Sequence, residues 1–225
     1  MDRVEPNKGR ARAGTHVRKK RILALARKLF WQNGYHSVGM RELARAYGCQ
    51  PANLYNYFET KEAILFEMLR EEMAKIIEPI AHLEEQDGDA VEQLRFIISR
   101  HVKAILSHPR SGKALFDVAL GILSRRNRNA IVSMRDTYER IVRKVLRRGQ
   151  EQGVFLPCDE KLVGVMIASM VTRTKMWFHP KKGATVDELA DFIFRFVLGG
   201  IQADEATHEA LWWPPGPMDK KLKPI

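Results

Sequence analysis

The stretch from residue 50 to residue 61 concentrates hydrogen-bonding side chains directly after a glycine-marked turn, "YGC". Pro51 suits the first turn of a helix, because its missing N–H would have no intrahelical partner there. Such a helix presents Gln50, Pro51, Ala52 and Asn53 outward at its N-terminal end. Asn and Gln can pair with adenine edges in the major groove, and Ala can contact a thymine methyl. The chemistry predicted for this stretch is therefore the reading of DNA bases.

Further polar groups in the same stretch are placed to contact the DNA backbone. Tyr55, Asn56 and Tyr57 can reach phosphates, which position a reader without specifying sequence. Lys61 begins the next expected helix, where amide dipoles already favour anions, so it is expected to clamp one more phosphate. The alternative is a helical hairpin whose tyrosines pack into a core.

Positive charge collects at the N-terminal end of the chain. The net charge is +11, and residues 1–62 hold 13 Lys and Arg against five Asp and Glu. This bias is expected for a surface that faces a polyanion such as nucleic acid or an anionic membrane. The segment "KGRARAG", in an arm expected to be disordered to Gly14, either enters a minor groove or serves only as a solubilising tail.

Apolar residues recur at helical spacing almost throughout, which predicts an all-α protein. The chain has 225 residues, 45% of them hydrophobic, enough for one large domain or two small ones. Gly34 and Gly48 are expected to end helices in the left-handed conformation, and Thr185 with Glu188 forms a capping box. The expected helices span about 15–33, 39–47, 51–57, 61–78, 91–106, 112–123, 131–150, 161–178 and 186–200.

Two short helices around the "YGCQ" turn, after a longer helix and a basic arm, have the layout of a helix-turn-helix DNA reader. The run "ILALARKLFWQNGYHSVGMRELARAYGCQPANLYNYFETKEAIL", from Ile22 to Leu65, resembles the DNA-binding domain of the TetR-type transcriptional regulators. Two departures concern the second helix, where Val38–Gly39 replaces the usual Thr or Ser, and the third, where Gln50 replaces the usual capping Ser. The resemblance implies DNA contacts at Gln50, Pro51, Ala52, Asn53, Tyr55, Asn56, Tyr57 and Lys61, with Arg18 and Arg41 as further backbone contacts.

The resemblance also implies a larger C-terminal helical domain that binds a small effector and forms a homodimer. Segments 161–178 and 186–200 are apolar on more than one stripe, so a four-helix interface between two copies is expected there. Small residues would permit close approach of these helices: Gly164, Ala168, Ser169, Gly199 and Gly200. The expected division is a basic arm at 1–14, a helix-turn-helix domain at 15–60, an effector and dimer domain at 61–201, and a tail at 202–225.

The run "RTKMWFHPKKGATVDELADFIFRFVLGGI" resembles the end of the KstR-like regulators of fatty-acid and steroid catabolism, whose effectors are acyl-CoA thioesters. This implies that Arg173, Lys175 and Trp177 lie near a pocket mouth. Adaptable methionine-rich walls suit a long acyl chain. The implied lining is Phe116, Met134, Tyr138, Met166 and Met170, although plain core is the alternative for these side chains.

Two other sets of residues invite a binding function and have simpler interpretations. His101 stands alone on an apolar helix face and is expected to be a satisfied core histidine. A second basic group is expected to form the solvated face of a helix, with recognition of ligand phosphates as the alternative. Its members are Arg125, Arg126, Arg128, Arg135, Arg140, Arg143, Lys144, Arg147 and Arg148.

Motifs for catalysis and metal binding are not found in the sequence. Cys49 and Cys158 lie far apart without metal-ligand spacing, and there is no GxSxG, HExxH, P-loop or GxGxxG pattern. We therefore expect no enzyme activity, no cofactor and no metal. No apolar run reaches the roughly 18 residues of a membrane span, so a soluble, cytoplasmic protein is expected.

The predicted function is a ligand-responsive regulator, most simply a repressor. It would bind a palindromic double-stranded DNA operator as a dimer and be released by a small hydrophobic effector such as an acyl-CoA thioester. Activation in place of repression is left open. The rival interpretations are an unrecognised enzyme and a membrane-surface or protein-adaptor role that uses the basic arm and the Trp212–Trp213 tail.

Overall fold

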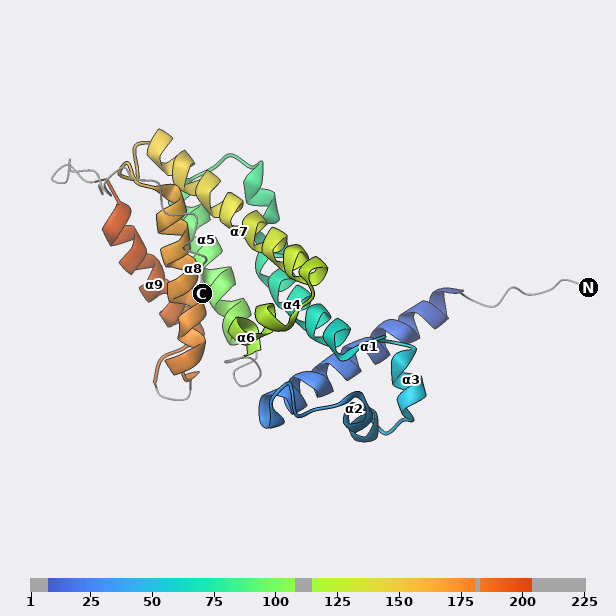
Figure 1. Cartoon of the computed structure of the whole chain (residues 1–225). Coiled ribbons are helices and arrows are strands. Elements are labelled where there is room, and N and C mark those ends of the chain that lie inside the picture. Colours follow the sequence, from blue (N-terminus) through green and yellow to red (C-terminus); the bar gives the residue numbers. More distant parts are fainter. Residues whose placement is uncertain (1–7, 108–114, 181–182, 204–225) are drawn as a thin grey trace, which may run out of the picture. The chain divides into compact units, whose positions relative to one another are not determined.

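The computed structural model describes residues 8–107, 115–180 and 183–203, and these residues confirm the all-α prediction (Figure 1). Within them the only strand-like pairing is an isolated bridge between Phe155 and Gln202. The elements in chain order are α1 (Lys8–Asn33), α2 (Met40–Tyr47), α3 (Pro51–Tyr55), α4 (Lys61–Ile77), the 3₁₀ helix η1 (Glu78–Glu84), α5 (Ala90–Leu106), α6 (Leu115–Ile122), α7 (Arg125–Glu151), α8 (Glu160–Trp177) and α9 (Val186–Ile201).

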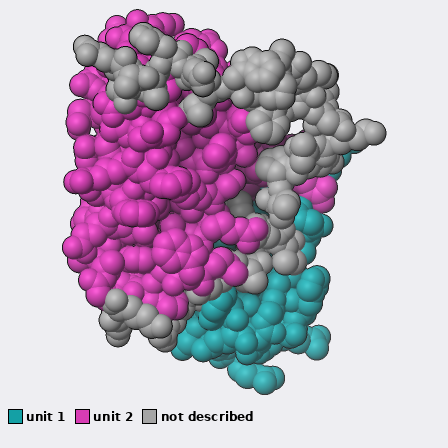
Figure 2. Space-filling model, turned by 90° about the vertical axis from the view of Figure 1, so that its left-hand side faces the viewer, with its two compact units in different colours: residues 1–70, 110–127 teal, residues 71–109, 128–225 magenta. Residues whose placement is uncertain are grey.

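The chain forms two compact units, coloured separately in Figure 2. Unit 1 comprises residues 1–70 and 110–127, and unit 2 comprises residues 71–109 and 128–225. The expected boundary after residue 60 differs from this division, because the structure assigns the first ten residues of α4 to unit 1. Ile64 and Met68 explain the difference, since both are buried in the core of unit 1.

The first helix is longer than the sequence analysis expects. It begins at Lys8 in the structure, so the expectation of a disordered arm as far as Gly14 is wrong for residues 8–14. Ala, Arg and Lys favour helices, and two glycines in this segment are not enough to break one. Residues 1–7 lie outside the described part of the chain.

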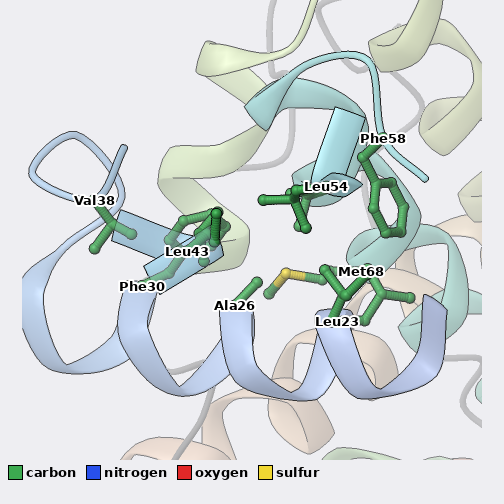
Figure 3. Close-up of a cluster of buried hydrophobic side chains, with 11 residues drawn as sticks. Leu23, Ala26, Phe30, Val38, Leu43, Leu54, Phe58 and Met68 are labelled. Carbon is green, nitrogen blue, oxygen red and sulfur yellow. The ribbon is translucent and has the colours of Figure 1, made fainter. Parts of the chain in front are cut away.

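The core of unit 1 joins its first four helices (Figure 3). Side chains from α1, α2, α3 and α4 converge on one another in this cluster. The turns between these helices are set by glycine, as predicted: Gly34 has φ 82° and Gly48 has φ 78°. The cluster comprises Ile22, Leu23, Ala26, Phe30, Val38, Leu43, Ala44, Leu54, Phe58, Ile64 and Met68.

Unit 2 is organised around α5, which packs against α8, α9 and η1. Three of its helices begin with side-chain caps: Asp89 for α5, Asp159 for α8, and the predicted Thr185–Glu188 capping box for α9. Other bounds differ modestly from expectation. The third helix ends at Tyr55 and not Tyr57, α7 begins six residues earlier, and Pro79 lies within η1.

Candidate nucleic-acid interface

The short helix α3 has one anchored side and one open side. Leu54 is 0% exposed and belongs to the core of unit 1, whereas Gln50, Pro51, Ala52 and Asn53 are all exposed. Pro51 occupies the first helical turn, as predicted, and Gln50 precedes it in an extended conformation without a side-chain cap bond. The structure therefore brings the four expected base-reading residues together on an accessible surface.

The turn between α2 and α3 fixes the direction in which α3 leaves the core. Gly48 adopts the left-handed conformation, and the N–H of Cys49 donates to the carbonyl of Ala44 at 2.9 Å. Such a C-cap satisfies the last carbonyls of α2 while the chain reverses. Leu43 and Ala44 bury the inner side of α2, and this leaves Arg41 exposed in its first turn.

Val38–Gly39 stands where a Thr or Ser is expected, and α2 begins there without a side-chain cap. Val38 is fully buried, and Gly39 is the N-cap of α2 without any side-chain hydrogen bond. Its carbonyl still accepts from the N–H of Leu43 at 3.0 Å. The start of α2 therefore lacks the side-chain oxygen that usually satisfies an N-terminal amide.

The predicted backbone contacts Arg18 and Tyr57 touch each other. Nη1 of Arg18 donates to the hydroxyl of Tyr57 at 3.1 Å, and this bond raises the pKa of Arg18. Arg18 is exposed and Tyr57 is half-buried, so the pair links α1 to the segment after α3 at the surface. Lys19 strengthens the same junction, with its Nζ 5.5 Å from the ring centroid of Phe58.

Tyr55 and Asn56 complete the exposed end of α3. Tyr55 is 49% exposed, an unusual position for an aromatic ring that could otherwise be buried, and Asn56 is the exposed C-cap residue. Both side chains are therefore available to a partner, as predicted.

Lys61 differs from the other expected contacts, because its ammonium binds within unit 1. Its Nζ donates to the backbone carbonyl of Tyr35 at 2.8 Å and lies 4.1 Å from the centroid of that ring. The side chain is half-buried, and desolvation lowers the pKa of its ammonium.

The charge around these residues favours an anionic partner. No Asp or Glu occurs between Glu5 and Glu42 in the sequence. Arg18, Lys19, Lys20, Arg21 and Arg41 are all exposed in this interval. Clustered cations beside hydrogen-bonding side chains are the footprint of a DNA-binding surface.

The residues expected to bind the effector differ in their exposure. Tyr138 is buried, with its hydroxyl 2.8 Å from Nδ1 of His101, so the prediction of a satisfied core histidine is confirmed. Met134, Met170 and Lys175 are half-buried, and Arg173 is exposed. Met166 and Trp177 are 56% and 61% exposed on α8. The side chain of Phe116 lies outside the described residues.

Two helices of unit 2 have a second apolar side that is exposed among the residues the structure describes. Ile167 and Val171 of α8 are buried, but Met166 and Trp177 are exposed. On α9, Phe194 is buried while Phe192 and Phe196 are 67% and 64% exposed. The exposed apolar face, defined here as Met166, Met176, Trp177, Phe192 and Phe196, matches the expectation of helices that are apolar on more than one stripe.

The basic side of α7 is largely occupied by carboxylates. Arg140 donates to Glu84 at 2.6 Å, and Arg147 donates to Glu160 at 3.1 Å. These bonds raise the pKa of both guanidinium groups. Lys144 also reaches Glu85 at 3.3 Å. The predicted polar face of this helix is thus a set of surface ion pairs.

Comparison with known proteins identifies the family. The family described as "Bacterial regulatory proteins, tetR family" matches residues 22–68, and "Tetracyclin repressor-like, C-terminal domain" matches residues 87–201. The chain belongs to the TetR family of transcriptional regulators. The first match spans α2 and α3, so the chain carries the family's helix-turn-helix DNA-binding domain.

Several TetR-family proteins are similar over most of the chain. The HTH-type transcriptional repressor KstR2 of Mycobacterium tuberculosis (strain ATCC 25618 / H37Rv) is 24% identical over 82% of this chain and 92% of its own length. The Fatty acid metabolism regulator protein of Bacillus subtilis (strain 168) is 24% identical over 80% of this chain and 93% of its own. The solved structure of AibR in complex with isovaleryl coenzyme A and operator DNA has a TM-score of 0.70 at 22% identity, covering 80% of this chain and 97% of AibR.

One contact of this TetR-family chain has no signal in the sequence. The Oε1 atom of Glu62 accepts from the backbone N–H of Ser124 at 2.8 Å and from the side-chain amide of Asn127 at 2.7 Å. Both bonds lie within unit 1, where they join the start of α4 to the corner between α6 and α7. Sequence reasoning missed Glu62 because its partners are more than 60 residues away.

The described residues hold no further site of a familiar kind. In the described part of this TetR-family chain, no group of three or more His, Cys, Asp and Glu is arranged to hold a metal ion. Cys49 and Cys158 are both unbridged. Over the same residues, no helix combines the length and the apolarity needed to cross a membrane.

Proposed function

We propose that this TetR-family protein is a repressor that binds a palindromic operator as a homodimer and leaves it when a coenzyme A thioester binds. The observation that supports the proposal most directly is that α3 is buried on one side and exposed on the other. Leu54 is fully buried, while Gln50, Ala52 and Asn53 stand exposed at the helix N-terminus, where a recognition helix meets base edges.

In the proposed complex the exposed residues divide into two roles. Gln50, Pro51, Ala52 and Asn53 contact bases, with Asn53 the strongest candidate for a bidentate bond to adenine. The remaining residues hold the protein in register through phosphates. They are Arg18, Arg41, Tyr55, Asn56, Tyr57 and Lys61, all of which are exposed or half-buried.

The exposed apolar face of α8 and α9 supports the homodimer. Burying Phe192 and Phe196, which are 67% and 64% exposed, against the same helices of a second copy would remove them from water. Ser169, Gly199 and Gly200 are exposed and would leave room for the close approach of a second copy. Gly164 does not share this role, because it is buried and a Cβ there would lie 3.5 Å from Val142.

The proposed effector class rests on the similar proteins and on the chemistry of α8. AibR was solved with isovaleryl coenzyme A, and another relative is named as a fatty acid metabolism regulator. Arg173 and Lys175 offer positive charge for the phosphates of coenzyme A. Met134 and Met170 are half-buried, as side chains that adapt to an acyl chain would be.

The effector proposal is tested by thermal unfolding with isovaleryl-CoA, octanoyl-CoA, palmitoyl-CoA and free coenzyme A. A ligand that binds only the native state at 100 times its Kd stabilises by about 2.7 kcal/mol, which raises the midpoint by several degrees. We expect a rise with at least one thioester that exceeds the rise with free coenzyme A. Arg173→Gln should reduce the rise, and Lys161→Gln, an exposed lysine of the same helix, should not. No rise with any thioester would contradict the effector class and leave the DNA-binding proposal standing.

A further inference from the structure

A single hydrogen bond at the surface of unit 1 joins Arg18 of α1 to Tyr57, which follows α3. Nη1 of Arg18 donates to the hydroxyl oxygen of Tyr57 at 3.1 Å. Chemistry fixes the direction of this bond, because a guanidinium has N–H donors and no acceptor, whereas a phenol hydroxyl has both. The bond therefore occupies a lone pair of the Tyr57 oxygen and directs the hydroxyl hydrogen to an acceptor other than Arg18.

The backbone is anchored on both sides of this bond. Ile22 and Leu23 lie about one turn after Arg18 and are 1% and 2% exposed in the core of unit 1. On the other side, the N–H of Tyr57 donates to the carbonyl of Leu54 at 3.0 Å, and Leu54 belongs to the same core. The two side chains therefore meet between segments that the core already holds in place.

A second contact runs beside the first. Lys19, the next residue of α1, places its Nζ 5.5 Å from the ring centroid of Phe58, the residue after Tyr57. Two consecutive residues of α1 thus contact two consecutive residues of the segment after α3. Side chains that are already held in their binding geometry lose less freedom when a partner binds, so this junction is preorganised.

The surroundings of the pair favour an anion that only accepts hydrogen bonds. The sequence has no Asp or Glu between residues 6 and 41, and Lys20, close to Arg18, is exposed. Arg18 itself is exposed and Tyr57 is half-buried. The other N–H groups of Arg18 and the O–H of Tyr57 are all donors, and a phosphate oxygen of the DNA backbone can accept from both side chains.

We propose that Arg18 is a positioning residue for Tyr57, and that its guanidinium orients the hydroxyl so that both side chains donate to one backbone phosphate as a single clamp. This inference rests on the proposed function, which places both residues among the backbone contacts but treats them as separate. The clamp makes them interdependent. Without Arg18, the Tyr57 hydroxyl is free to turn its hydrogen away from the phosphate, so loss of either group should remove most of the contribution of the other.

The experiment is a double-mutant cycle on the affinity for a duplex that the wild-type protein enriches from a random-sequence library. Tyr57→Phe removes only the hydroxyl and should weaken binding by about threefold to tenfold in the wild-type background. In the Arg18→Gln background the same change should weaken binding by less than about twofold. Lys20→Gln, an exposed lysine of α1, is the matched control, and Tyr57→Phe should keep its full effect there. Equal effects of Tyr57→Phe in the wild-type and Arg18→Gln backgrounds would overturn the clamp.

The same titrations, repeated at several salt concentrations, separate the charge of Arg18 from the neutral hydroxyl. Arg18→Gln should lower the slope of log K against log salt by about one, and Tyr57→Phe should leave the slope unchanged. An unchanged slope in Arg18→Gln would also overturn the clamp, because the guanidinium would then meet no phosphate. Either of these results leaves the proposed function standing as long as wild type prefers the enriched duplex. A wild-type protein that enriches no duplex would contradict the proposed function, and the clamp with it.

Discussion

The Oε1 atom of Glu62 lies 2.7 Å from the side-chain nitrogen of Asn127, and the same oxygen accepts the Ser124 N–H at 2.8 Å. These bonds lower the pKa of Glu62, with the Ser124 backbone bond as the largest cause. A carboxylate with a lowered native pKa stabilises the fold above its unfolded pKa, and this contribution is lost as pH falls through the native value.

Replacement of Glu62 by alanine should therefore have a pH-dependent effect on stability. At pH 7 we expect Glu62→Ala to lose about 1 kcal/mol of unfolding free energy, since two N–H groups lose a charged acceptor. The difference should shrink as the pH falls below about 4.5, the ordinary glutamate value. Urea unfolding between pH 7 and pH 3 measures this, with Glu59→Ala as an exposed control. A difference that stays constant with pH would show that the carboxylate charge is irrelevant.

The buried pair of His101 and Tyr138 predicts a second pH dependence. Burial lowers the pKa of His101 from 6.5 to about 4 and raises that of Tyr138. As pH falls from 6.5 to 4 the unfolded chain gains a proton at His101 that the folded chain does not, so stability decreases by on the order of 3 kcal/mol. Chemical denaturation of wild type and His101→Gln across this range should show a steeper fall for wild type. Parallel curves would contradict a neutral buried His101.

Gly149 in α7 is predicted to tolerate no side chain. A Cβ at this position would clash with the ring of Phe155, which is 2% exposed and has little room to move. Alanine normally stabilises a helix relative to glycine by about 1 kcal/mol, but overpacking of this kind costs about 1–3 kcal/mol, so Gly149→Ala should be destabilising. Gly121→Ala, where no atom lies within 4 Å of the added Cβ, should be neutral or stabilising. The midpoint of thermal unfolding should be measured for both variants. A Gly149→Ala chain as stable as wild type would contradict the close packing of Phe155 on Gly149.

The exposed apolar face of α8 and α9 predicts the oligomeric state. Phe192→Glu places a charge where the phenylalanine is 67% exposed in one chain, which should break a dimer that buries this face. Val132→Glu, at an exposed apolar residue of α7, should leave the dimer intact. Sedimentation or light scattering should give a monomer for the first variant and a dimer for the second. A dimeric Phe192→Glu would place the interface elsewhere.

Features with a local signal could be predicted from the sequence. Gly34 and Gly48 end their helices as expected because a positive φ needs glycine, and the Thr185–Glu188 box lies within one turn of helix. The exposed side of α3 was likewise predicted, since Leu54 is the apolar residue that can anchor so short a helix.

Features that depend on distant packing could not be predicted. Lys61 is expected to contact a phosphate from its position at the start of α4, and the sequence does not indicate its bond to the carbonyl of Tyr35, 26 residues earlier. Met166 and Trp177 are expected near a pocket and both are exposed in the described chain; α8 is apolar on several sides, and periodicity alone does not say which side faces inward. The helix α1 begins earlier than the sequence predicts, because the Ala, Lys and Arg of residues 8–14 favour a helix.

The central claim, that α3 reads DNA sequence, is tested most directly by the affinity of wild type and Asn53→Ala for a library-enriched duplex and for a scrambled duplex of equal length. Wild type should prefer the enriched duplex by about a thousandfold or more. Asn53→Ala should lose roughly 5- to 100-fold of that preference while its salt slope stays unchanged, because a base contact and not a phosphate contact is removed. If wild type binds both duplexes equally, or if Asn53→Ala retains the full preference, the assignment of α3 as the reader is contradicted.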